Sequence, residues 1–364
     1  MGRIKEEMSD LMEQVLKNFP VNSFTDTLLL WFYENKRDLP WRNNPTPYHV
    51  WISEVMLQQT QVKTVIPYFN NFIRKFPTIK ALALADEQDV LKAWEGLGYY
   101  SRARNLHHAA KTILERFNGE FPTTYDDVIA LKGIGTYTAG AIMSMAFGEK
   151  AAAVDGNVMR VMSRILYITD DIGLSKTKKY FERIMMDVVP EKDPGAFNQS
   201  LMDLGATICT PRSPKCGECP VQAFCRGFKA DVQEQLPVKA KKIKPKRVPL
   251  IILIIQDDKG RYLMNQRPST GLLGGMWEFV QFEGMTVEEF QKQTHLFNEK
   301  DWRVERYLGE VTHVFSHLIW EMRVYHMKCS FKSLPEEMAW FTEEQLDEIP
   351  ISTAHKKVRQ LLKG

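Results

Sequence analysis

The sequence predicts an all-α region followed by a separate α+β domain, and three observations support that division. From residue 6 to about residue 208 the apolar residues recur at helical spacing, and the alternation typical of strands is scarce. Four of the five cysteines then fall within residues 209–225. Beyond a basic linker the pattern changes to short runs that favour strands. A chain of 364 residues is also longer than one compact domain usually is.

The composition excludes a disordered chain and a membrane protein. Hydrophobic residues make up 44% of the chain and charged residues 26%, which is typical of folded domains. The longest apolar stretch, residues 248–255, is too short to cross a bilayer. The first residues lack the apolar core of a signal peptide, and Glu6 breaks a myristoylation motif. We therefore expect a cytoplasmic protein without a membrane partner.

Charge is distributed unevenly along the chain. Residues 1–236 hold 28 Lys and Arg against 28 Asp and Glu, whereas residues 237–247 hold six basic residues and no acid. A balance of zero in the larger region does not indicate nucleic acid, so any such function must rest on local motifs. The basic segment is interpreted as a solvated linker, and the alternative is that it also binds DNA phosphates.

In the first region, glycine and proline separate the helical runs. Clear examples of helical spacing are residues 28–32, 50–57 and 142–146. The separators are Pro40, Pro67, Gly96, Gly98, Pro122, Gly133, Gly135, Pro190 and Pro194. This region is therefore predicted to consist of helices joined by short turns.

In the second region, the runs between turn signals are predicted as strands. Strands are expected over residues 248–256, 261–267, 277–282, 303–311, 317–329 and 338–341, and helices near residues 287–294 and 355–362. The sequence Asp-Asp-Lys-Gly at residues 257–260 is a hairpin signal. We place the α+β domain at residues 248–364, after a linker at residues 231–247 and a helical region at residues 1–230.

Cys209, Cys216, Cys219 and Cys225 have the spacing of a metal centre. In a reducing cytoplasm a tight cluster of cysteines indicates metal ligands more than disulfides. Zinc sites usually use two pairs of ligands a dozen or more residues apart, whereas four thiolates in one short loop suit a [4Fe-4S] cluster. Zinc and unligated cysteines are the alternatives. Cys329 is interpreted as a buried apolar residue.

A glycine-containing turn joins two helical runs at residues 131–140. Gly133 and Gly135 let the backbone turn sharply, and the N-terminus of the following helix offers free amide groups to an anion. This is the chemistry of a helix-hairpin-helix that binds a DNA phosphate. An ordinary corner between two helices explains the same pattern.

Two acids stand in surroundings that would separate their pKa values. Glu54 lies in an apolar helical run, where burial would raise its pKa and let the carboxyl act as a general acid. Asp155 precedes Gly156 and Asn157 at the predicted start of a helix, which would favour the ionised form. One neutral and one ionised carboxyl is the pairing that cleavage of a glycosidic bond requires. A surface glutamate and a plain N-cap aspartate are the structural alternatives.

The ordered set of motifs resembles the MutY-type adenine DNA glycosylases of the endonuclease III superfamily, over nearly the whole chain. The motifs are LPWR at residues 39–42, WISEVMLQQT at 51–60, GLGYYSR at 96–102, the turn at 133–135, VDGN at 154–157, LGA at 204–206 and the four cysteines. The resemblance implies an all-α helix-hairpin-helix glycosylase core with an iron-sulfur cluster loop. Its six-helix barrel would span about residues 38–145, and an iron-sulfur subdomain would combine residues 1–37 and 146–230.

The resemblance also assigns roles to the candidate catalytic residues. Glu54 would protonate a flipped-out adenine and later activate water, while Asp155 would stabilise the oxocarbenium-like sugar. Tyr137 and Asn157 would orient the two acids. Lyases of the superfamily carry a lysine at the position of Tyr137, where it forms a Schiff base with the sugar. The resemblance therefore implies a monofunctional glycosylase that leaves the strand intact.

Other residues match those that contact DNA in the family. In the helical region these are Arg42, Gln59, Thr60, Leu97, Tyr99, Gly133 and Gly135. Arg42 is a candidate for the pocket that holds the flipped base. Gln59 and Tyr99 match the residues that fill the gap in the base stack, with Thr60 and Leu97 close to the orphaned partner base. Tyr100 is expected in the core.

The C-terminal part resembles the Nudix-like domain of MutY enzymes. A Nudix hydrolase needs an Arg-Glu pair and clustered glutamates to bind magnesium, and residues 284–309 lack that constellation, so hydrolysis is not expected. The family reads 8-oxoguanine through a loop that matches Phe315, Ser316 and His317. Taken without the family, Phe315 would be a core residue and His317 an ordinary surface histidine.

The sequence thus predicts a monomeric adenine DNA glycosylase of base excision repair. Its partner would be double-stranded DNA with 8-oxoguanine:adenine or guanine:adenine mispairs, and its location the cytoplasm, at a bacterial-type nucleoid. Two alternatives stay open. One is an endonuclease III-type glycosylase and lyase acting on oxidised pyrimidines, and the other is a non-catalytic iron-sulfur protein that binds DNA.

Overall fold

The computed structural model describes residues 15–240, 244–285, 289, 304–329, 331 and 334–363. By their internal contacts, the residues form two compact units. Unit 1 comprises residues 1–80 and 108–241, and unit 2 comprises residues 81–107 and 242–364. No helix in the described part of the chain is both long and apolar enough to span a membrane.

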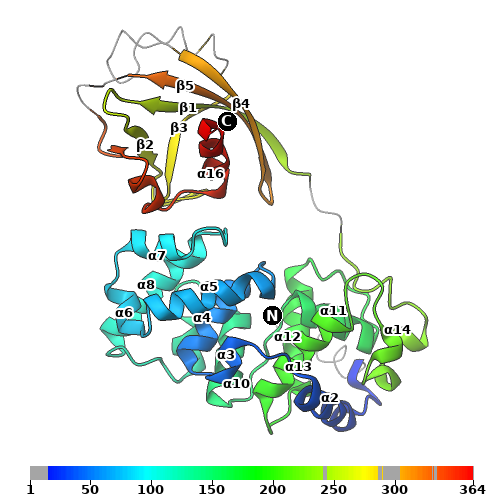
Figure 1. The fold of residues 1–364 in the computed structure, drawn as a ribbon. Coiled ribbons are helices and arrows are strands. Elements are labelled where there is room, and N and C mark those ends of the chain that lie inside the picture. Colours follow the sequence, from blue (N-terminus) through cyan, green and yellow to red (C-terminus); the bar gives the residue numbers. More distant parts are fainter. Residues whose placement is uncertain are drawn as a thin grey trace. The chain divides into compact units, whose positions relative to one another are not determined.

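Unit 1 is built of helices, as predicted, and no strand occurs among its described residues (Figure 1). Its elements are α2 (Val21–Asn35), α3 (Pro40–Asn43), α4 (Pro47–Leu57), α5 (Val62–Lys75), α9 (Tyr125–Ile129), α10 (Thr136–Phe147), α11 (Gly156–Leu166), α12 (Ser175–Val188), α13 (Pro194–Thr207), η1 (Cys216–Glu218), η2 (Gln222–Phe224) and α14 (Arg226–Lys229). Two helices, α6 (Ile79–Leu84) and α8 (Ser101–Arg116), run across the division between the units.

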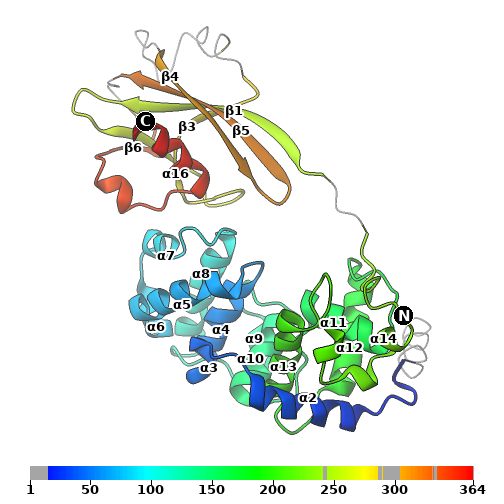
Figure 2. The same cartoon turned by 45° about the vertical axis from the view of Figure 1, so that its right-hand side comes forward.

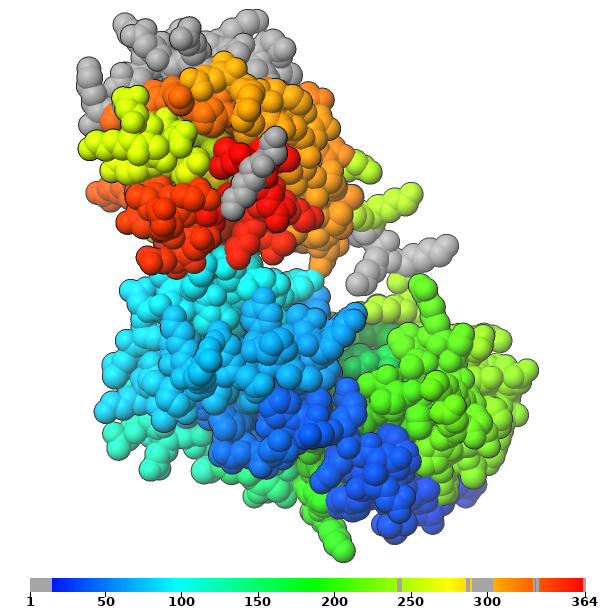
Figure 3. Space-filling view, viewed as in Figure 1, coloured from blue at the N-terminus to red at the C-terminus, as the bar shows by residue number. Residues whose placement is uncertain are grey.

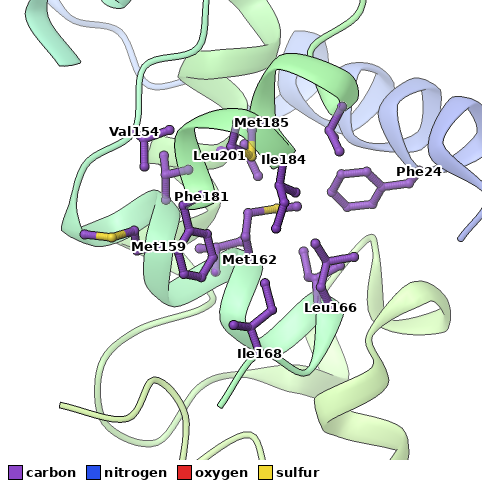
Figure 4. Close-up of a cluster of buried hydrophobic side chains, with 14 of the residues drawn as sticks. Phe24, Val154, Met159, Met162, Leu166, Ile168, Phe181, Ile184, Met185 and Leu201 are labelled. Atoms are coloured by element: carbon purple, nitrogen blue, oxygen red, sulfur yellow. The ribbon is translucent and has the colours of Figure 1, made fainter. Parts of the chain in front are cut away.

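The hydrophobic core of unit 1 gathers around α11. Phe24 of α2, Met162 of α11, Phe181 of α12 and Leu201 of α13 are fully buried in one cluster (Figure 4). Burying a side chain of this size stabilises the fold by about 1.5–3 kcal/mol. Because α11 packs against α13, and α13 against α2, this core fixes the N-terminus of α11, where Asp155 lies.

Unit 2 contains a six-stranded mixed sheet in the order β4-β5-β1-β3-β2-β6. The strands are β1 (Lys246–Gln256), β2 (Tyr262–Gln266), β3 (Trp277–Glu283), β4 (Val304–Val314), β5 (Leu318–Lys328) and β6 (Met338–Phe341). β1 and β5 run parallel, and the other paired strands run antiparallel. Figure 2 shows β4 and β5 as a long curved pair. The predicted mixed α+β character is confirmed.

β1 lies in the middle of this sheet and is buried on both faces. Ile252 and Ile254 face the cluster that includes Val358 of α16 (Thr353–Gln360), whereas Ile251 and Leu253 belong to the cluster on the other face. A central strand explains why its sequence reads as an unbroken apolar run. The remaining elements are η3 (Gln345–Asp347) and η4 (Leu361–Lys363). The helix expected near residues 287–294 lies, apart from Glu289, outside the described residues.

Residues on both sides of the predicted linker centre make backbone hydrogen bonds. Its early residues are held to unit 1, because the Ile172 amide donates to the Val238 carbonyl at 3.0 Å and the Ala240 amide donates to Asp171 at 3.2 Å. At its other end, β1 begins at Lys246 and pairs that residue with β5. Both described ends of the predicted linker are therefore bonded, one within unit 1 and the other within the sheet of unit 2.

Residues 81–107 lie in the helical part of the sequence but belong to unit 2, a grouping that the sequence analysis did not predict. This segment contains α7 (Glu87–Ala93) and the first residues of α8. In Figure 3 its cyan atoms meet the red atoms of the C-terminal segment. The predicted boundaries of the three regions stay a prediction.

Candidate active site

Glu54 is held on the buried side of α4. The helix begins at Pro47, and the Thr46 hydroxyl caps it by accepting the His49 amide at 3.2 Å. Only 3% of Glu54 is exposed. This burial raises the pKa of Glu54 to about 7, although a hydrogen bond from Tyr137 opposes the shift. The structure therefore gives Glu54 the raised pKa that the sequence predicted.

Asp155 is the N-cap of α11, as the sequence predicted. Its Oδ1 accepts the amides of Asn157 at 2.9 Å and Val158 at 2.7 Å, and its Oδ2 accepts the Asn157 side chain at 3.0 Å. The expected low pKa is wrong in direction: burial raises the pKa of Asp155, and the capping hydrogen bonds only oppose that shift. The loss of solvation outweighs the helix terminus here.

Close packing of α10 against the residues before Asp155 brings α10 close to the start of α11. A Cβ on Gly140 would lie 2.0 Å from the Ala152 carbonyl oxygen, so a larger side chain would force them apart. The fully buried Asn198 side chain donates to the Ser144 hydroxyl at 2.9 Å and to the Ala151 carbonyl at 2.8 Å. This amide therefore joins α13 to both α10 and the segment that ends at Asp155.

Six predicted residues line a single cavity of about 250 Å³ in unit 1. They are Arg42, Glu54, Thr60, Tyr137, Asp155 and Asn157. The Tyr137 hydroxyl donates a hydrogen bond to Glu54. Burial and the nearby carboxylates hold the pKa of Tyr137 well above its ordinary value, so the phenol stays protonated. The cavity thus combines a carboxyl that titrates near neutrality with a second carboxyl fixed by hydrogen bonds.

Asp203 is a site residue that sequence reasoning missed. Arg42 forms a bidentate ion pair with it, donating to Oδ2 at 2.8 Å and to Oδ1 at 3.0 Å, and Arg37 donates to Oδ1 at 2.5 Å. Burial works to raise the pKa of Asp203, but the two guanidinium groups outweigh it and hold that pKa below its usual range. The signal available in the sequence was its position directly before Leu204 in the LGA motif. An acid that is buried there needs a charged partner.

The two residues predicted to fill a gap in the base stack share an unusual backbone. Gln59 has φ 59° and Tyr99 has φ 48°, in the left-handed region that is unfavourable for side chains of this size. Both are exposed, Tyr99 by 44%. Tyr100 is buried, as expected. Leu97 is also buried, which leaves its side chain the least accessible of the predicted DNA contacts.

The predicted helix-hairpin-helix is present as α9, a turn and α10. Gly133 has φ 84°, so it needs the freedom of glycine. Gly135 differs from the expectation of a sharp turn: it has φ −103° and extended backbone, and it is the N-cap of α10. Because a glycine offers no side chain to cap the helix, the first amides of α10 receive no side-chain acceptor from the cap position.

Phe315, Ser316 and His317 form the turn between β4 and β5, closed by the Phe315 amide donating to the Leu318 carbonyl at 2.8 Å. Ser316 and His317 are exposed at its tip. Phe315 is half-buried, with its ring 4.9 Å from that of Trp320, so it packs as a core residue. Within unit 2, the Ser316 hydroxyl is hydrogen-bonded to the Tyr99 hydroxyl.

The four predicted cysteine ligands line one pocket beside Arg164 of α11. Arg164 is 1% exposed and donates to the Cys209 sulfur at 3.3 Å and to the Thr210 carbonyl at 2.7 Å. At the other end of the loop, the Cys225 sulfur accepts the Phe228 amide at 3.4 Å. Both ends of the cysteine loop are therefore attached to helices.

The four cysteines share a pocket, but their arrangement is not that of a single-ion site. Among the described residues, no three His, Cys, Asp or Glu side chains are close enough to hold one metal ion. A tetrahedral zinc site needs sulfurs about 3.8 Å apart. Burial raises the pKa of Cys219 to about 12, and the neighbouring cysteines add to the shift. Burial also raises the pKa of Cys216 and Cys225, and a bound cation would favour the thiolate form of these three cysteines.

Three segments of the chain match known families. Residues 52–191 match the HhH-GPD superfamily base excision DNA repair proteins. Residues 209–225 match the iron-sulfur binding domain of endonuclease III, and residues 251–361 match the NUDIX domain. The order of these matches is the order of the predicted motifs.

Whole proteins are similar over most of the chain. The human adenine DNA glycosylase is 34% identical, covering 94% of this chain and 74% of that protein. The adenine DNA glycosylase of Buchnera aphidicola subsp. Schizaphis graminum (strain Sg) is 32% identical, covering 93% and 99%. A solved structure of a thermostable thymine-DNA glycosylase has a TM-score of 0.54 at 29% identity, covering 59% of this chain and 99% of that one. Identity at this level over such lengths shows that the chain belongs to the MutY-type adenine DNA glycosylases, which are DNA N-glycosylases of base excision repair.

Proposed function

We propose that this enzyme removes adenine mispaired with 8-oxoguanine or guanine and leaves the DNA strand intact. The observation that carries the proposal is the hydrogen bond from the Tyr137 hydroxyl to Glu54. The position at which lyases of the superfamily carry an amine thus holds a phenol that stays protonated and cannot form a Schiff base. Without an amine at this position, the reaction that the two carboxyls support is acid-assisted hydrolysis.

Glu54 supplies the proton for the first step. With a pKa of about 7, a substantial fraction of this carboxyl is protonated at neutral pH. The proton passes to N7 of the flipped adenine, the bond between C1′ and N9 breaks, and its electron pair leaves with the base. The resulting carboxylate then takes a proton from the water that attacks C1′, which regenerates the acid.

Asp155 stabilises the sugar while that bond breaks. Positive charge develops at C1′, and a carboxylate fixed by three hydrogen bonds is already oriented to meet it. Although burial raises the pKa of Asp155, the developing cation favours its ionised form. Asn157 keeps the carboxylate in place by donating its side-chain amide.

Arg42 lines the base pocket, and Asp203 holds it in place. Both terminal nitrogens of Arg42 are engaged by Asp203, and its Nε is buried with no hydrogen-bond partner in the described part of the chain. Buried donors are rarely left unpaired, and a ring nitrogen of the flipped base would satisfy this one. Phe32, whose ring lies 5.3 Å below the Arg42 guanidinium, holds the arginine in place.

The opposite base is read in unit 2, through Ser316 and His317 at the tip of the β4–β5 turn. Both side chains are exposed, so the His317 imidazole, and the Ser316 hydroxyl that is hydrogen-bonded to Tyr99, can meet a base edge. On the helical side, Gln59 and Tyr99 would fill the gap left by the adenine, and the uncapped amides of α10 after Gly135 would bind a phosphate.

Cys209, Cys216, Cys219 and Cys225 would hold a [4Fe-4S] cluster. Such a cluster supplies a rigid centre around which the loop after α13 folds, and no step of base removal is assigned to it. Arg164 would orient the first ligand through its hydrogen bond to the Cys209 sulfur. Iron and acid-labile sulfide analysis of the purified protein, with four atoms of each expected per chain, tests this assignment.

One assay separates the proposed reaction from that of a lyase. Duplexes with 8-oxoguanine:adenine, guanine:adenine and thymine glycol are incubated with enzyme, with and without alkali. We expect cleavage of the adenine strand of the first two, and only after alkali. Strand cleavage of the thymine glycol duplex without alkali, with trapping of a protein–DNA adduct by borohydride, would instead identify an endonuclease III-type enzyme.

A further inference from the structure

A polar cluster centred on Glu95 joins the two segments of unit 2. Glu95 accepts the Ile351 amide at 2.8 Å, the Lys356 ammonium at 2.6 Å and the Lys92 ammonium at 3.0 Å. Lys92 also donates to the Ile349 carbonyl at 3.0 Å. The Glu95 side chain is only 8% exposed, whereas the Lys356 side chain that pairs with it is 48% exposed. We name this set of contacts the Glu95 clasp.

The surroundings of the clasp show that it belongs to a continuous contact. Gln88 donates to the Gly275 carbonyl at 3.2 Å, and Arg104 donates to the Gly274 carbonyl. A Cβ on Gly275 would lie 3.2 Å from Leu91, so only a glycine allows this approach without displacement. Residues 81–107 thus contact residues 242–364 through hydrogen bonds to backbone carbonyls. Such contacts are more specific than an isolated ion pair at the surface.

Glu95 is also the first residue of the loop that presents Tyr99. Gly96, Gly98 and Tyr99 all have positive φ, at 101°, 72° and 48°. Arg102 of α8 donates to the Gly98 carbonyl at 3.1 Å, and within the loop the Gly96 amide donates to the Tyr100 hydroxyl at 3.1 Å. A loop with this internal bonding moves as one piece, and the position of Glu95 therefore sets the position of Tyr99.

The C-terminal side of the clasp leads to the β4–β5 turn. Ile351 is followed by Ser352, whose hydroxyl caps α16 by accepting the His355 amide at 3.3 Å. The ring of His355 lies 6.2 Å from that of Trp320, which in turn lies 4.9 Å from Phe315. The clasp is thereby connected through packed groups to the turn that carries Ser316.

We propose that Glu95 is a positioning residue for recognition of the base opposite the adenine. The clasp and the hydrogen bond between Tyr99 and Ser316 connect the same two segments of unit 2. Residues of both segments, Tyr99 and Ser316 among them, line a cavity of about 300 Å³. Glu95 fixes the base-reading turn against the loop of Tyr99, so that one residue enters the stack where the other reads the partner base. The inference rests on the proposed function.

The test compares Glu95→Gln, Ser316→Ala and their combination with the wild-type enzyme. Glu95→Gln keeps an oxygen for the Ile351 amide but loses the charge that holds Lys92 and Lys356. We expect the ratio of single-turnover rates on 8-oxoguanine:adenine and guanine:adenine to fall by about fivefold or more, the value of one good hydrogen bond. The double variant should fall no further than Ser316→Ala alone, because both changes act on the same arrangement.

Glu310→Gln is the matched control. It removes the charge of a glutamate in the same unit that pairs with Arg323 at an exposed site, so its ratio should equal that of the wild type. Hydrogen exchange supplies a readout independent of catalysis: Glu95→Gln should speed exchange at Ile351 and across residues 313–318, with the melting temperature of unit 1 unchanged.

Two results would overturn the role of Glu95. One is an unchanged ratio together with unchanged exchange at residues 313–318, and the other is a double variant whose ratio falls by the product of the single effects. A wild-type enzyme that shows no preference for 8-oxoguanine would instead contradict the proposed function, and faster exchange in Glu95→Gln would then still identify the clasp.

Discussion

The cavity of unit 1 that holds Glu54 and Asp155, and the β4–β5 turn of unit 2 that carries Ser316, are built in opposite ways. Glu54 is buried and Asp155 is fixed by three hydrogen bonds, and helix packing around Gly140 and Asn198 holds their supports. Ser316, in contrast, is exposed at the tip of a two-stranded turn. Under the proposed function, this difference separates catalysis from the choice of substrate. Changes in the cavity should then alter the rate, and changes at the turn should alter the preference between duplexes.

The largest effect is expected from Asp155→Asn. The amide still caps α11 but no longer carries the charge that meets the developing cation, so adenine release should slow by about a thousandfold or more. Single-turnover kinetics measure the loss, and fluorescence anisotropy should show DNA affinity within about twofold of wild type. Asp193→Asn, at the exposed N-cap of α13, is the matched control and should react normally. A wild-type rate for Asp155→Asn would remove this residue from the mechanism.

The pH dependence of the rate should follow Glu54. Because the protonated carboxyl is the active form and its pKa is raised to about 7, the rate should fall tenfold per pH unit above that value. Below it the rate should level off and then decline as Asp155, whose pKa is also raised, becomes protonated. The result is a bell-shaped pH profile, and its acid limb should lie at a pH above the ordinary pKa of an aspartate.

Tyr137→Phe sharpens this assignment. The Tyr137 hydroxyl lowers the pKa of Glu54 by hydrogen bonding to it, so its removal should move the alkaline limb to higher pH. Single-turnover profiles of the two enzymes measure the shift. An alkaline limb that stays in place would show that another group controls it.

A smaller effect is expected at the turn. Substituting Ser316 and His317 together by alanine should reduce the preference for 8-oxoguanine over guanine by about tenfold, the value of one or two hydrogen bonds. The rate on guanine:adenine should stay within about twofold, because the cavity is untouched. Competition between the two duplexes in one reaction measures the preference. Equal discrimination before and after the change would contradict the role given to this turn.

The smallest effect is expected from Phe315→Leu. Since the ring packs against His313 and Trp320, its loss should lower the free energy of unfolding by about 1 kcal/mol. The preference between duplexes should change little, as chemical denaturation and the competition assay can show separately. A large loss of the preference for 8-oxoguanine, with an unchanged free energy of unfolding, would instead indicate that Phe315 contacts the DNA.

Local patterns in the sequence predicted much of this structure. Asp155 could be recognised as a helix cap, Glu54 as an acid in an apolar run and the four cysteines as one cluster, because each signal lies within a few residues. The strands of unit 2 followed from alternation and turn residues in the same way. In these cases the deciding residues are neighbours in sequence, and the prediction agreed with the structure; Gly135, whose backbone is extended, is an exception.

Contacts between distant residues could not be predicted in this way. Asp203 acquires its role from Arg37 and Arg42, more than 160 positions earlier. The Asp155 pKa was predicted in the wrong direction because the sequence displays the helix terminus but not the depth of burial. The attachment of residues 81–107 to the C-terminal segment likewise depends on groups such as Glu95 and Ile351, 256 positions apart.

The most direct test of the account is a crystal structure of the Asp155→Asn enzyme bound to a duplex with adenine opposite 8-oxoguanine. We predict an extruded adenine in the cavity lined by Glu54 and Tyr137, with N7 within hydrogen-bond distance of the Glu54 carboxyl and C1′ beside residue 155. An adenine that stays stacked in the duplex, or that occupies a cavity without either carboxyl, would contradict the proposal that these two acids act on one nucleoside.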